Sequence, residues 1–113
     1  FCYKLNPEEL TREEAEKECT EEGANLAWVT SAYENNMLRD TFWADNTWIG
    51  LTDIMEEGKY IWVKTGVADY LNWLPGEPEA TDEDEDCVEM VITGEWDDQS
   101  CEELNPSICK YEP

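Results

Sequence analysis

Acidic side chains are concentrated in one stretch of the sequence and in a short group that follows it. Between Glu77 and Glu89, eight of thirteen residues are Asp or Glu, and Asp97 and Asp98 follow Trp96. Crowded carboxylates repel one another unless a cation offsets the repulsion, and hard oxygen ligands of this kind suit calcium. The pattern therefore predicts a calcium site, although a solvated acidic loop without a metal gives the same pattern.

Catalysis is a poor match for these residues. The chain has no histidine, which excludes Ser-His-Asp and Cys-His nucleophiles and His-ligated metals. Two carboxylates could in principle form a glycosidase pair. Carboxylates crowded around a cation have lowered pKa values, however, and make poor general acids. We therefore expect a binding protein rather than an enzyme.

The overall charge excludes some partners. The 113 residues include 29 acidic and 7 basic side chains, which gives a formal net charge of −22. Nucleic acids and anionic membranes would repel such a chain, and no apolar run approaches the length that crosses a membrane. Hydrophobic residues nevertheless make up 41% of the chain and aromatic residues 12%, so it is not a disordered acidic tail. We expect a single folded domain over residues 1–113.

The cysteines indicate the compartment. Their number is odd, and no two have C-x-x-C spacing: Cys2, Cys19, Cys87, Cys101 and Cys109. Widely spaced cysteines in a short chain favour disulfides and a secreted or extracellular protein, the alternative being a cytosolic protein with buried free thiols. An odd number leaves one cysteine without a partner in this chain. We expect this to be Cys2, near the start of the chain, whose partner would lie upstream or in another chain. The chain begins without Met or a leader, as a mature chain or an excised domain does.

The cysteines also bear on the acidic residues. If Cys87 bonded to Cys101, the acidic stretch would be held close to Asp97 and Asp98, although these groups are separate in the sequence.

Two helices are predicted in the first 40 residues. A capping box at 11–14 begins the first, which carries Ala15 and Cys19 on one face and ends at Gly23. A second capping box, at 31–34, begins a helix that turns Met37 and Leu38 inward.

Short strands are predicted after the helices, at 48–51, 60–63 and 87–92. Residues 64–86 form a long connection rich in Gly, Pro, Asp and Glu, and loops of that length usually have a function. The fold class is therefore α+β, with two early helices, antiparallel sheet and a long loop that carries the acidic stretch.

Over nearly its whole length the chain resembles a C-type lectin-like domain. The resemblance rests on several ordered motifs: residues 15–19 with 23–27, the run 48–51, Glu77-Pro78-Glu79, residues 85–90, residues 96–101 and Cys109. It implies the C-type lectin-like fold and calcium as cofactor.

The resemblance also implies covalent and backbone features. The disulfides would be Cys19–Cys109 and Cys87–Cys101, and Cys2 would pair upstream, as it does in long-form members. Trp48 and Trp96 would be core residues, and Pro78 would follow a cis peptide bond.

Calcium ligands follow from the same resemblance. The principal site would be formed by Glu77, Glu79, Glu85, Asp97 and Asp98. An accessory site would use Asp53, Glu57, Glu85 and Asp86. Its remaining position is Ala80, which cannot coordinate, so this second site would need Asp82 or Asp84 as a substitute ligand.

Sugar binding in this family would use the ion together with Glu77, Glu79, Glu85 and Asp97. Mannose-type members carry Glu-Pro-Asn and Trp-Asn-Asp, whereas Glu79 and Asp97 replace the two asparagines here. A carboxylate accepts hydrogen bonds but cannot donate them, so two donors to sugar hydroxyls are lost. Each is worth about 0.5–1.5 kcal/mol, and binding should weaken by roughly 5- to 150-fold.

Two functions follow from these observations. The first is a calcium-dependent carbohydrate-binding module of weak or altered mannose-type specificity, for which the Glu-Pro motif favours mannose, fucose or N-acetylglucosamine over galactose. The alternative keeps the fold and the calcium but binds a protein, mineral or ice surface instead of a glycan.

Overall fold

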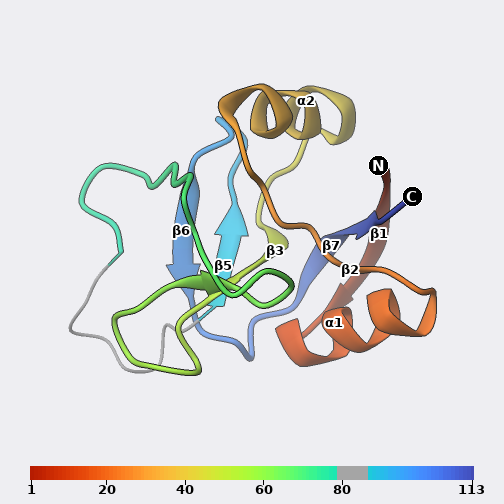
Figure 1. The fold of residues 1–113 in the computed structure, drawn as a ribbon, viewed down its shortest axis with the longest axis horizontal. Coiled ribbons are helices and arrows are strands. Elements are labelled where there is room, and N and C mark those ends of the chain that lie inside the picture. The colour runs from red at the N-terminus through yellow and green to blue at the C-terminus, as the bar shows by residue number, and fades with distance from the viewer. Residues whose placement is uncertain (79–86) are drawn as a thin grey trace.

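The computed structural model describes residues 1–78 and 87–113. Within that part of the chain it contains two helices and seven strands (Figure 1). In chain order these are β1 (Cys2–Leu10), α1 (Arg12–Glu21), β2 (Asn25–Leu26), α2 (Ala32–Phe42), β3 (Thr47–Thr52), β4 (Ile61–Trp62), β5 (Cys87–Met90), β6 (Trp96–Gln99) and β7 (Asn105–Tyr111). The two expected helices are confirmed, as are the three expected strands, with shorter bounds for β4 and β5.

Helix α1 forms as its sequence predicts. The Thr11 hydroxyl accepts from the Glu14 backbone N–H, and the Glu14 carboxylate accepts from the Thr11 backbone N–H, so the capping box is complete. Ala15 and Cys19 are both fully buried on the inner face of the helix. The chain leaves the helix through Gly23, whose φ of +81° is a conformation that glycine adopts readily.

Helix α2 has only half of its expected capping box. The Ser31 hydroxyl accepts from the Glu34 backbone N–H as predicted. The Glu34 carboxylate instead accepts from the backbone N–H of Thr30, from the Tyr3 hydroxyl and from the Lys110 ammonium group. The prediction was wrong at this carboxylate: one oxygen accepts from the Thr30 N–H instead of the Ser31 N–H, and the other accepts from Tyr3 and Lys110, which are far away in the sequence.

The sheet is mixed rather than antiparallel. Its strand order is β1-β7-β3-β5-β6, with β2 also paired to β7 and β4 to β3. β3 runs parallel to β7 through the pairing of Trp48 with Ser107, while the other pairs of named strands are antiparallel as expected. Every residue of β3 is buried, as suits a strand at the centre of the molecule.

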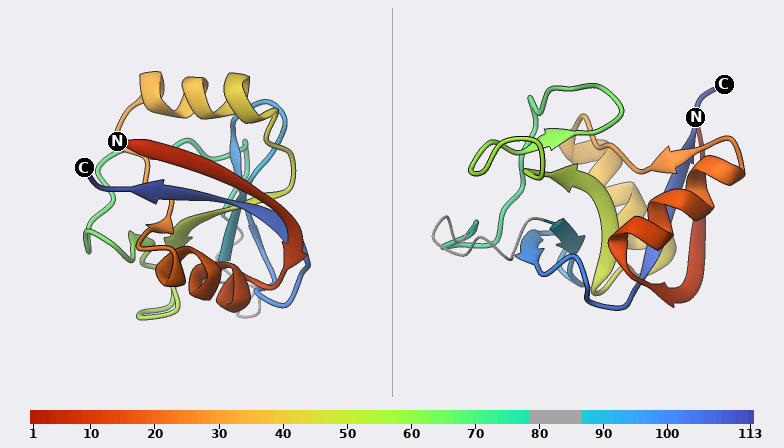
Figure 2. Two further views of the ribbon diagram at one scale, coloured as in Figure 1. Left: turned by 90° about the vertical axis from the view of Figure 1, so that its right-hand side faces the viewer. Right: turned by 90° about the horizontal axis from the view of Figure 1, so that it is seen from below.

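The terminal strands close the fold. β1 pairs antiparallel with β7 in a register that runs from Cys2 opposite Tyr111 to Asn6 opposite Ser107, so the two ends of the chain lie together (Figure 1). Figure 2 shows this pair of strands passing between α2 on one side and α1 on the other.

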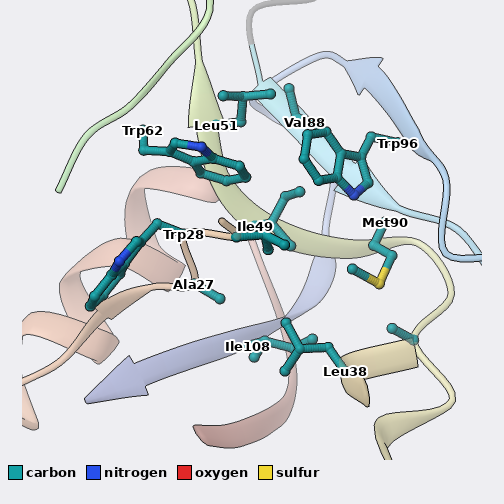
Figure 3. Close-up of a cluster of buried hydrophobic side chains, with 12 residues drawn as sticks. Ala27, Trp28, Leu38, Ile49, Leu51, Trp62, Val88, Met90, Trp96 and Ile108 are labelled. Atoms are coloured by element: carbon teal, nitrogen blue, oxygen red, sulfur yellow. The ribbon is translucent and has the colours of Figure 1, made fainter. Parts of the chain in front are cut away.

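The core surrounds β3 and β5. Trp48 and Trp96 are both fully buried, as the sequence predicts, and the Trp48 indole N–H donates to the backbone carbonyl of Leu10. Figure 3 shows the indoles of Trp62 and Trp96 beside the aliphatic side chains of β3, and their ring centroids are 5.3 Å apart in an edge-to-face arrangement. Trp96 therefore fixes the start of β6 in the core.

Both expected disulfides are present. Cys19 is bonded to Cys109 and joins α1 to β7, while Cys87 is bonded to Cys101 and joins β5 to the segment after β6. Cys2 is exposed and forms no disulfide in this chain.

Candidate metal centre

Three of the expected calcium ligands converge at β6. Glu77, Asp97 and Asp98 each offer a carboxylate oxygen, and these oxygens all lie within 4.8 Å of one another. Among residues 1–78 and 87–113 this is the one group of three acidic, Cys or His side chains so arranged. The expected ligands Glu79 and Glu85 lie outside the described residues, so their presence at the site stays a prediction.

Strand β6 positions the two aspartates. In the antiparallel pairing with β5, Asp97 lies opposite Glu89 and Asp98 lies opposite Val88, directly after the buried Trp96. Asp98 is fully buried, whereas Asp97 is half-buried. Both carboxylates therefore come from a strand anchored by the core.

Backbone pairing brings Glu77 to the same place. The Leu74 backbone N–H donates to the Trp96 carbonyl over 2.8 Å, and the Trp96 N–H donates to the Asn72 carbonyl over 2.8 Å. A turn then returns the chain, since the Glu77 N–H donates to the Leu74 carbonyl and Gly76 has a φ of +86°. The peptide bond from Glu77 to Pro78 is cis, as expected.

Gln99 supports the site and was missed by the sequence reasoning. Its side-chain amide donates to Asp97 Oδ2 over 2.7 Å. Residues two apart on a strand share a face, so this contact could have been found from the spacing of Asp97 and Gln99. The bond orients the Asp97 carboxylate and leaves Oδ1 of that group for another ligand.

The donor set fits calcium. Calcium takes six to eight oxygen ligands at 2.3–2.6 Å, so two oxygens on one ion lie no more than about 5 Å apart. The three carboxylate oxygens meet that limit, and oxygen is the donor that this ion prefers.

The Cys87–Cys101 disulfide lies next to this cluster. Cys87 pairs with Gln99 across the β5–β6 hairpin, and its Cα is 5.1 Å from that of Cys101. The chain leaves the described residues after Pro78, next to Glu77, and returns at Cys87. Both ends of the interval that carries Glu79 and Glu85 are thus fixed along β6.

The expected accessory site is only partly described. Asp53 is 2% exposed, and its Oδ2 accepts from the Gly58 backbone N–H over 2.8 Å. Glu57 also accepts from that N–H, over 3.2 Å. The other candidates, Asp82, Asp84, Glu85 and Asp86, and the non-coordinating Ala80, lie outside the described residues. The accessory site therefore stays a prediction.

Glu89 belongs to the acidic stretch but not to the cluster. It is 3% exposed, and its carboxylate accepts from the side-chain amides of Asn46 over 2.7 Å and Asn105 over 3.1 Å. Burial raises the pKa of Glu89, and these two hydrogen bonds only partly oppose the rise. This carboxylate connects β5 to the residue before β3 and to the first residue of β7.

Comparison with known proteins identifies the fold family. The sequence model of the Lectin C-type domain matches residues 8–111. The chain belongs to the C-type lectin domain family. Members of this family are binding proteins and not enzymes, which confirms the sequence-based expectation.

Relatives and solved structures agree with this assignment. Collectin-10 of Gallus gallus is 34% identical to this C-type lectin domain over 113 residues, which cover 96% of the chain and 41% of that relative. The cow C-type carbohydrate-recognition domain of CD23, solved in the presence of GlcNAc2Man3 oligosaccharide, superimposes with a TM-score of 0.89 at 32% identity, over 99% of this chain and 88% of that one. A calcium-independent type II antifreeze protein superimposes with a TM-score of 0.89 at 28% identity, over 96% and 83% of the two chains. The chain thus spans less than half the length of its curated relative.

Within residues 1–78 and 87–113, neither helix is long and apolar enough to cross a membrane.

Proposed function

We propose that this C-type lectin domain binds calcium through Glu77, Glu79, Glu85, Asp97 and Asp98 and binds glycans through the bound ion. The observation that supports the proposal is the convergence of three carboxylate oxygens within 4.8 Å at β6. The solved CD23 domain, crystallised with an oligosaccharide, lends support from a chain of the same fold. When bound, calcium would offer positive charge and open coordination positions to a pair of sugar hydroxyls.

The preferred glycans are of the mannose, fucose or N-acetylglucosamine class, bound weakly. The Glu77-Pro78 pair supports this class. Glu79 and Asp97 weaken it, because neither carboxylate donates a hydrogen bond to a sugar hydroxyl as an asparagine amide would.

Calorimetric titration of calcium into chelator-treated protein tests the metal site. We expect a dissociation constant at or below about 10⁻⁴ M, since several carboxylates surround one divalent ion. Asp98→Asn should weaken binding by about tenfold or more, because it removes one ligand charge while keeping the shape of the side chain.

The matched control is Glu103→Gln, which removes the same charge from an exposed side chain that is not a member of the cluster. It should bind calcium as the wild type does. Equal calcium binding by the wild type and Asp98→Asn, or no heat from either, would contradict the proposed site.

Adhesion to an ice surface is the second candidate function, with protein and mineral surfaces as related partners. The likeness to a calcium-independent antifreeze protein favours it, as does the loss of both amide donors at positions 79 and 97. Thermal hysteresis of a protein solution, measured with calcium and with chelator, separates the candidates. Hysteresis without glycan binding would select the ice surface.

A secreted or extracellular location is also proposed. Its support is the pair of disulfides, which form and persist in oxidising compartments.

A further inference from the structure

A depression in the surface lies at the C-terminal end of α2, and none of its lining residues belongs to the acidic cluster. It has a volume of about 350 Å³ and is lined by Arg39, Asp40, Trp43 and Ile92. Ile92 belongs to the turn between β5 and β6, whereas Asp98 pairs with Val88 nearer the open end of that hairpin. Ile92 lies two residues beyond the end of β5 and four residues after Val88, a separation of up to roughly 13 Å along an extended chain.

Both the exposure and the backbone conformation at position 43 are unfavourable for tryptophan. Its side chain is 79% exposed, so its indole gains little from burial. Its φ of +52° lies in the left-handed region, which residues with a side chain adopt at a cost and which usually favours glycine at a helix end. Neither the core nor the helix end explains a tryptophan at this position.

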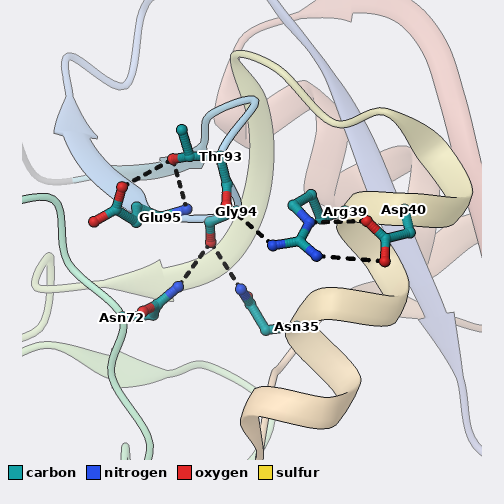
Figure 4. Close-up of polar contacts among 7 residues, drawn as sticks. All are labelled: Asn35, Arg39, Asp40, Asn72, Thr93, Gly94 and Glu95. Carbon is teal, nitrogen blue, oxygen red and sulfur yellow. Dashed lines mark hydrogen bonds and ion pairs between the residues drawn. The ribbon is translucent and has the colours of Figure 1, made fainter.

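Two charged side chains line the same depression as this indole. Arg39 donates from Nε to Asp40 Oδ1 over 2.9 Å and from Nη2 to Asp40 Oδ2 over 3.4 Å (Figure 4). Its third nitrogen, Nη1, donates to the Thr93 carbonyl over 3.4 Å. The guanidinium group is therefore held between α2 and the β5–β6 turn.

The turn itself is also fixed from several sides. The Gly94 carbonyl accepts from the side-chain amides of Asn35 over 2.7 Å and Asn72 over 2.9 Å (Figure 4). The Ile92 backbone N–H donates to Asp45 Oδ1 over 3.1 Å. The walls of the depression are consequently formed before any ligand arrives, which lowers the entropy lost on binding.

We propose that this depression is a second glycan site, which takes one pyranose ring without calcium. The flat aliphatic face of the sugar would stack on the exposed Trp43 indole, beside Ile92. Its hydroxyls would accept from the Arg39 guanidinium and donate to the Asp40 carboxylate, which together offer both kinds of partner. The volume suits one ring, since small-molecule sites begin at about 300 Å³.

Charge also favours a neutral ligand. Arg39 is already paired with Asp40, and the chain carries a net charge of −22, so an anionic ligand would be repelled. This site goes beyond the proposed function, because none of its residues belongs to the calcium cluster.

Two-dimensional NMR on the protein in excess chelator tests the proposal. The probes are the methyl glycosides of mannose, galactose, glucose and N-acetylglucosamine, each added to saturation. At least one should shift the Trp43 indole N–H signal and the Ile92 amide signal, with a dissociation constant on the order of 1–10 mM. Trp43→Ala should weaken that binding by about tenfold, which removes it from the detectable range.

Three variants make the outcome decisive. Trp43→Gly suits the left-handed backbone, so it should fold at least as stably as the wild type and still lose the sugar response. Tyr33→Ala removes the other exposed aromatic side chain of α2, about ten residues or 15 Å along the helix, and should leave the response intact. Glu103→Gln, at an exposed residue of neither site, should also keep it.

No shift with any glycoside in chelator, or shifts that survive Trp43→Ala, would overturn the second site and leave the calcium site untouched. Conversely, a chelator-insensitive response that Trp43→Gly abolishes would establish the second site even if calcium-dependent binding were absent.

Discussion

At the scale of single residues, two positions decide what the calcium cluster can recognise. Asp97 accepts a hydrogen bond from Gln99 and lies within ligand distance of Glu77 and Asp98. Glu79, the other carboxylate in place of an amide, lies outside the described residues. Both substitutions add negative charge for the metal and remove donors for the sugar. Metal affinity and sugar affinity should therefore change in opposite directions when these positions are altered.

The double variant Glu79→Asn, Asp97→Asn tests that opposition. Restoring two amide donors should strengthen binding of methyl mannoside in saturating calcium by roughly 5- to 150-fold, from about 0.5–1.5 kcal/mol per hydrogen bond. Calcium affinity should fall in the same variant because two ligand charges are lost. Titrations of both ligands measure the two effects, and parallel changes would refute the opposition.

Asp98 provides a residue-scale test that needs no sugar. This fully buried carboxylate lies beside Glu77 and Asp97, so it adds repulsion when no cation is bound. Asp98→Asn should raise the melting temperature in chelator and reduce the further rise on adding calcium. Thermal unfolding with and without calcium measures both, with Glu103→Gln as the control. A lower melting temperature in chelator would show that the carboxylate is stabilised by the protein alone.

At the scale of elements, β7 meets α2 and β1 through one buried cation. Lys110 is 2% exposed, and its Nζ donates to Glu34 over 2.5 Å and to the Trp28 carbonyl over 3.1 Å. The same nitrogen lies 4.3 Å from the centroid of the Phe1 ring and 4.2 Å from that of Trp28. Lys110 thus joins four other residues, namely Phe1, Trp28, Glu34 and, through its hydrogen bond to Glu34, Tyr3.

Removing that cation should be costly. Lys110→Met would leave the Glu34 carboxylate buried without its ion pair, and the free energy of unfolding should fall by about 3–5 kcal/mol. The double variant Lys110→Met, Glu34→Gln should regain part of the loss. The exposed pair Lys4–Glu22 is the matched control, and Lys4→Met should change stability by less than about 1 kcal/mol. Urea unfolding measures all four proteins.

The same pair predicts a pH dependence. Burial alone would raise the pKa of Glu34, but hydrogen bonds from Lys110, Tyr3 and the Thr30 backbone outweigh it and lower the pKa. A lowered folded pKa gives stability that is present above the unfolded value of about 4.5 and is lost as the pH falls through the folded value. Glu34→Gln should therefore lose less stability than the wild type between about pH 5 and pH 2, in urea unfolding. Equal acid sensitivity would contradict this assignment.

Elements differ in how well the sequence predicts them. The capping box of α1 involves residues three apart in the sequence, so it was predicted. The Glu34 carboxylate of α2 accepts a hydrogen bond from Lys110 of β7, which is distant in the sequence and could not be predicted locally. Strands β1 and β7 were missed, because Pro7 and Pro106 and several charged residues break the alternation typical of strands. The parallel pairing of β3 with β7 depends on the whole topology and has no local signal.

The candidate site shows the same division. The resemblance implied the two disulfides and the cis bond at Pro78, and both are confirmed. It also implied Glu77, Asp97 and Asp98 as calcium ligands; their carboxylates lie together, and their role stays a prediction. Gln99 was not anticipated, although its spacing of two residues from Asp97 on one strand was a signal for the contact between their side chains. The depression at Trp43 was also missed, since it forms only when the end of α2 meets the β5–β6 turn.

At the scale of the whole molecule, the net charge of −22 acts on every cation. Such a field concentrates counter-ions around the protein and destabilises the compact state through self-repulsion. If calcium binds as proposed, it would relieve part of that repulsion and stabilise the folded chain by linkage. The domain should thus depend on ionic strength as well as on calcium.

Salt provides the test at this scale. Raising sodium chloride from about 0.01 M to about 1 M shortens the screening length from roughly 30 Å to 3 Å. The melting temperature in chelator should rise, and calcium affinity should fall several-fold, because the attraction and the repulsion are both screened. Calorimetry across the salt series measures the affinity. An affinity independent of salt would show that only the local ligands matter.

The central claim is that glycan binding at the Glu77, Asp97 and Asp98 cluster requires calcium. A glycan array probed with tetramerised domain, in excess calcium and again in excess chelator, tests it most directly. We predict binding to mannose-, fucose- or N-acetylglucosamine-bearing glycans that chelator removes and that Asp98→Asn lacks. A blank array from folded, calcium-loaded protein would contradict the claim and leave a calcium-stabilised scaffold whose partner is a protein or a surface.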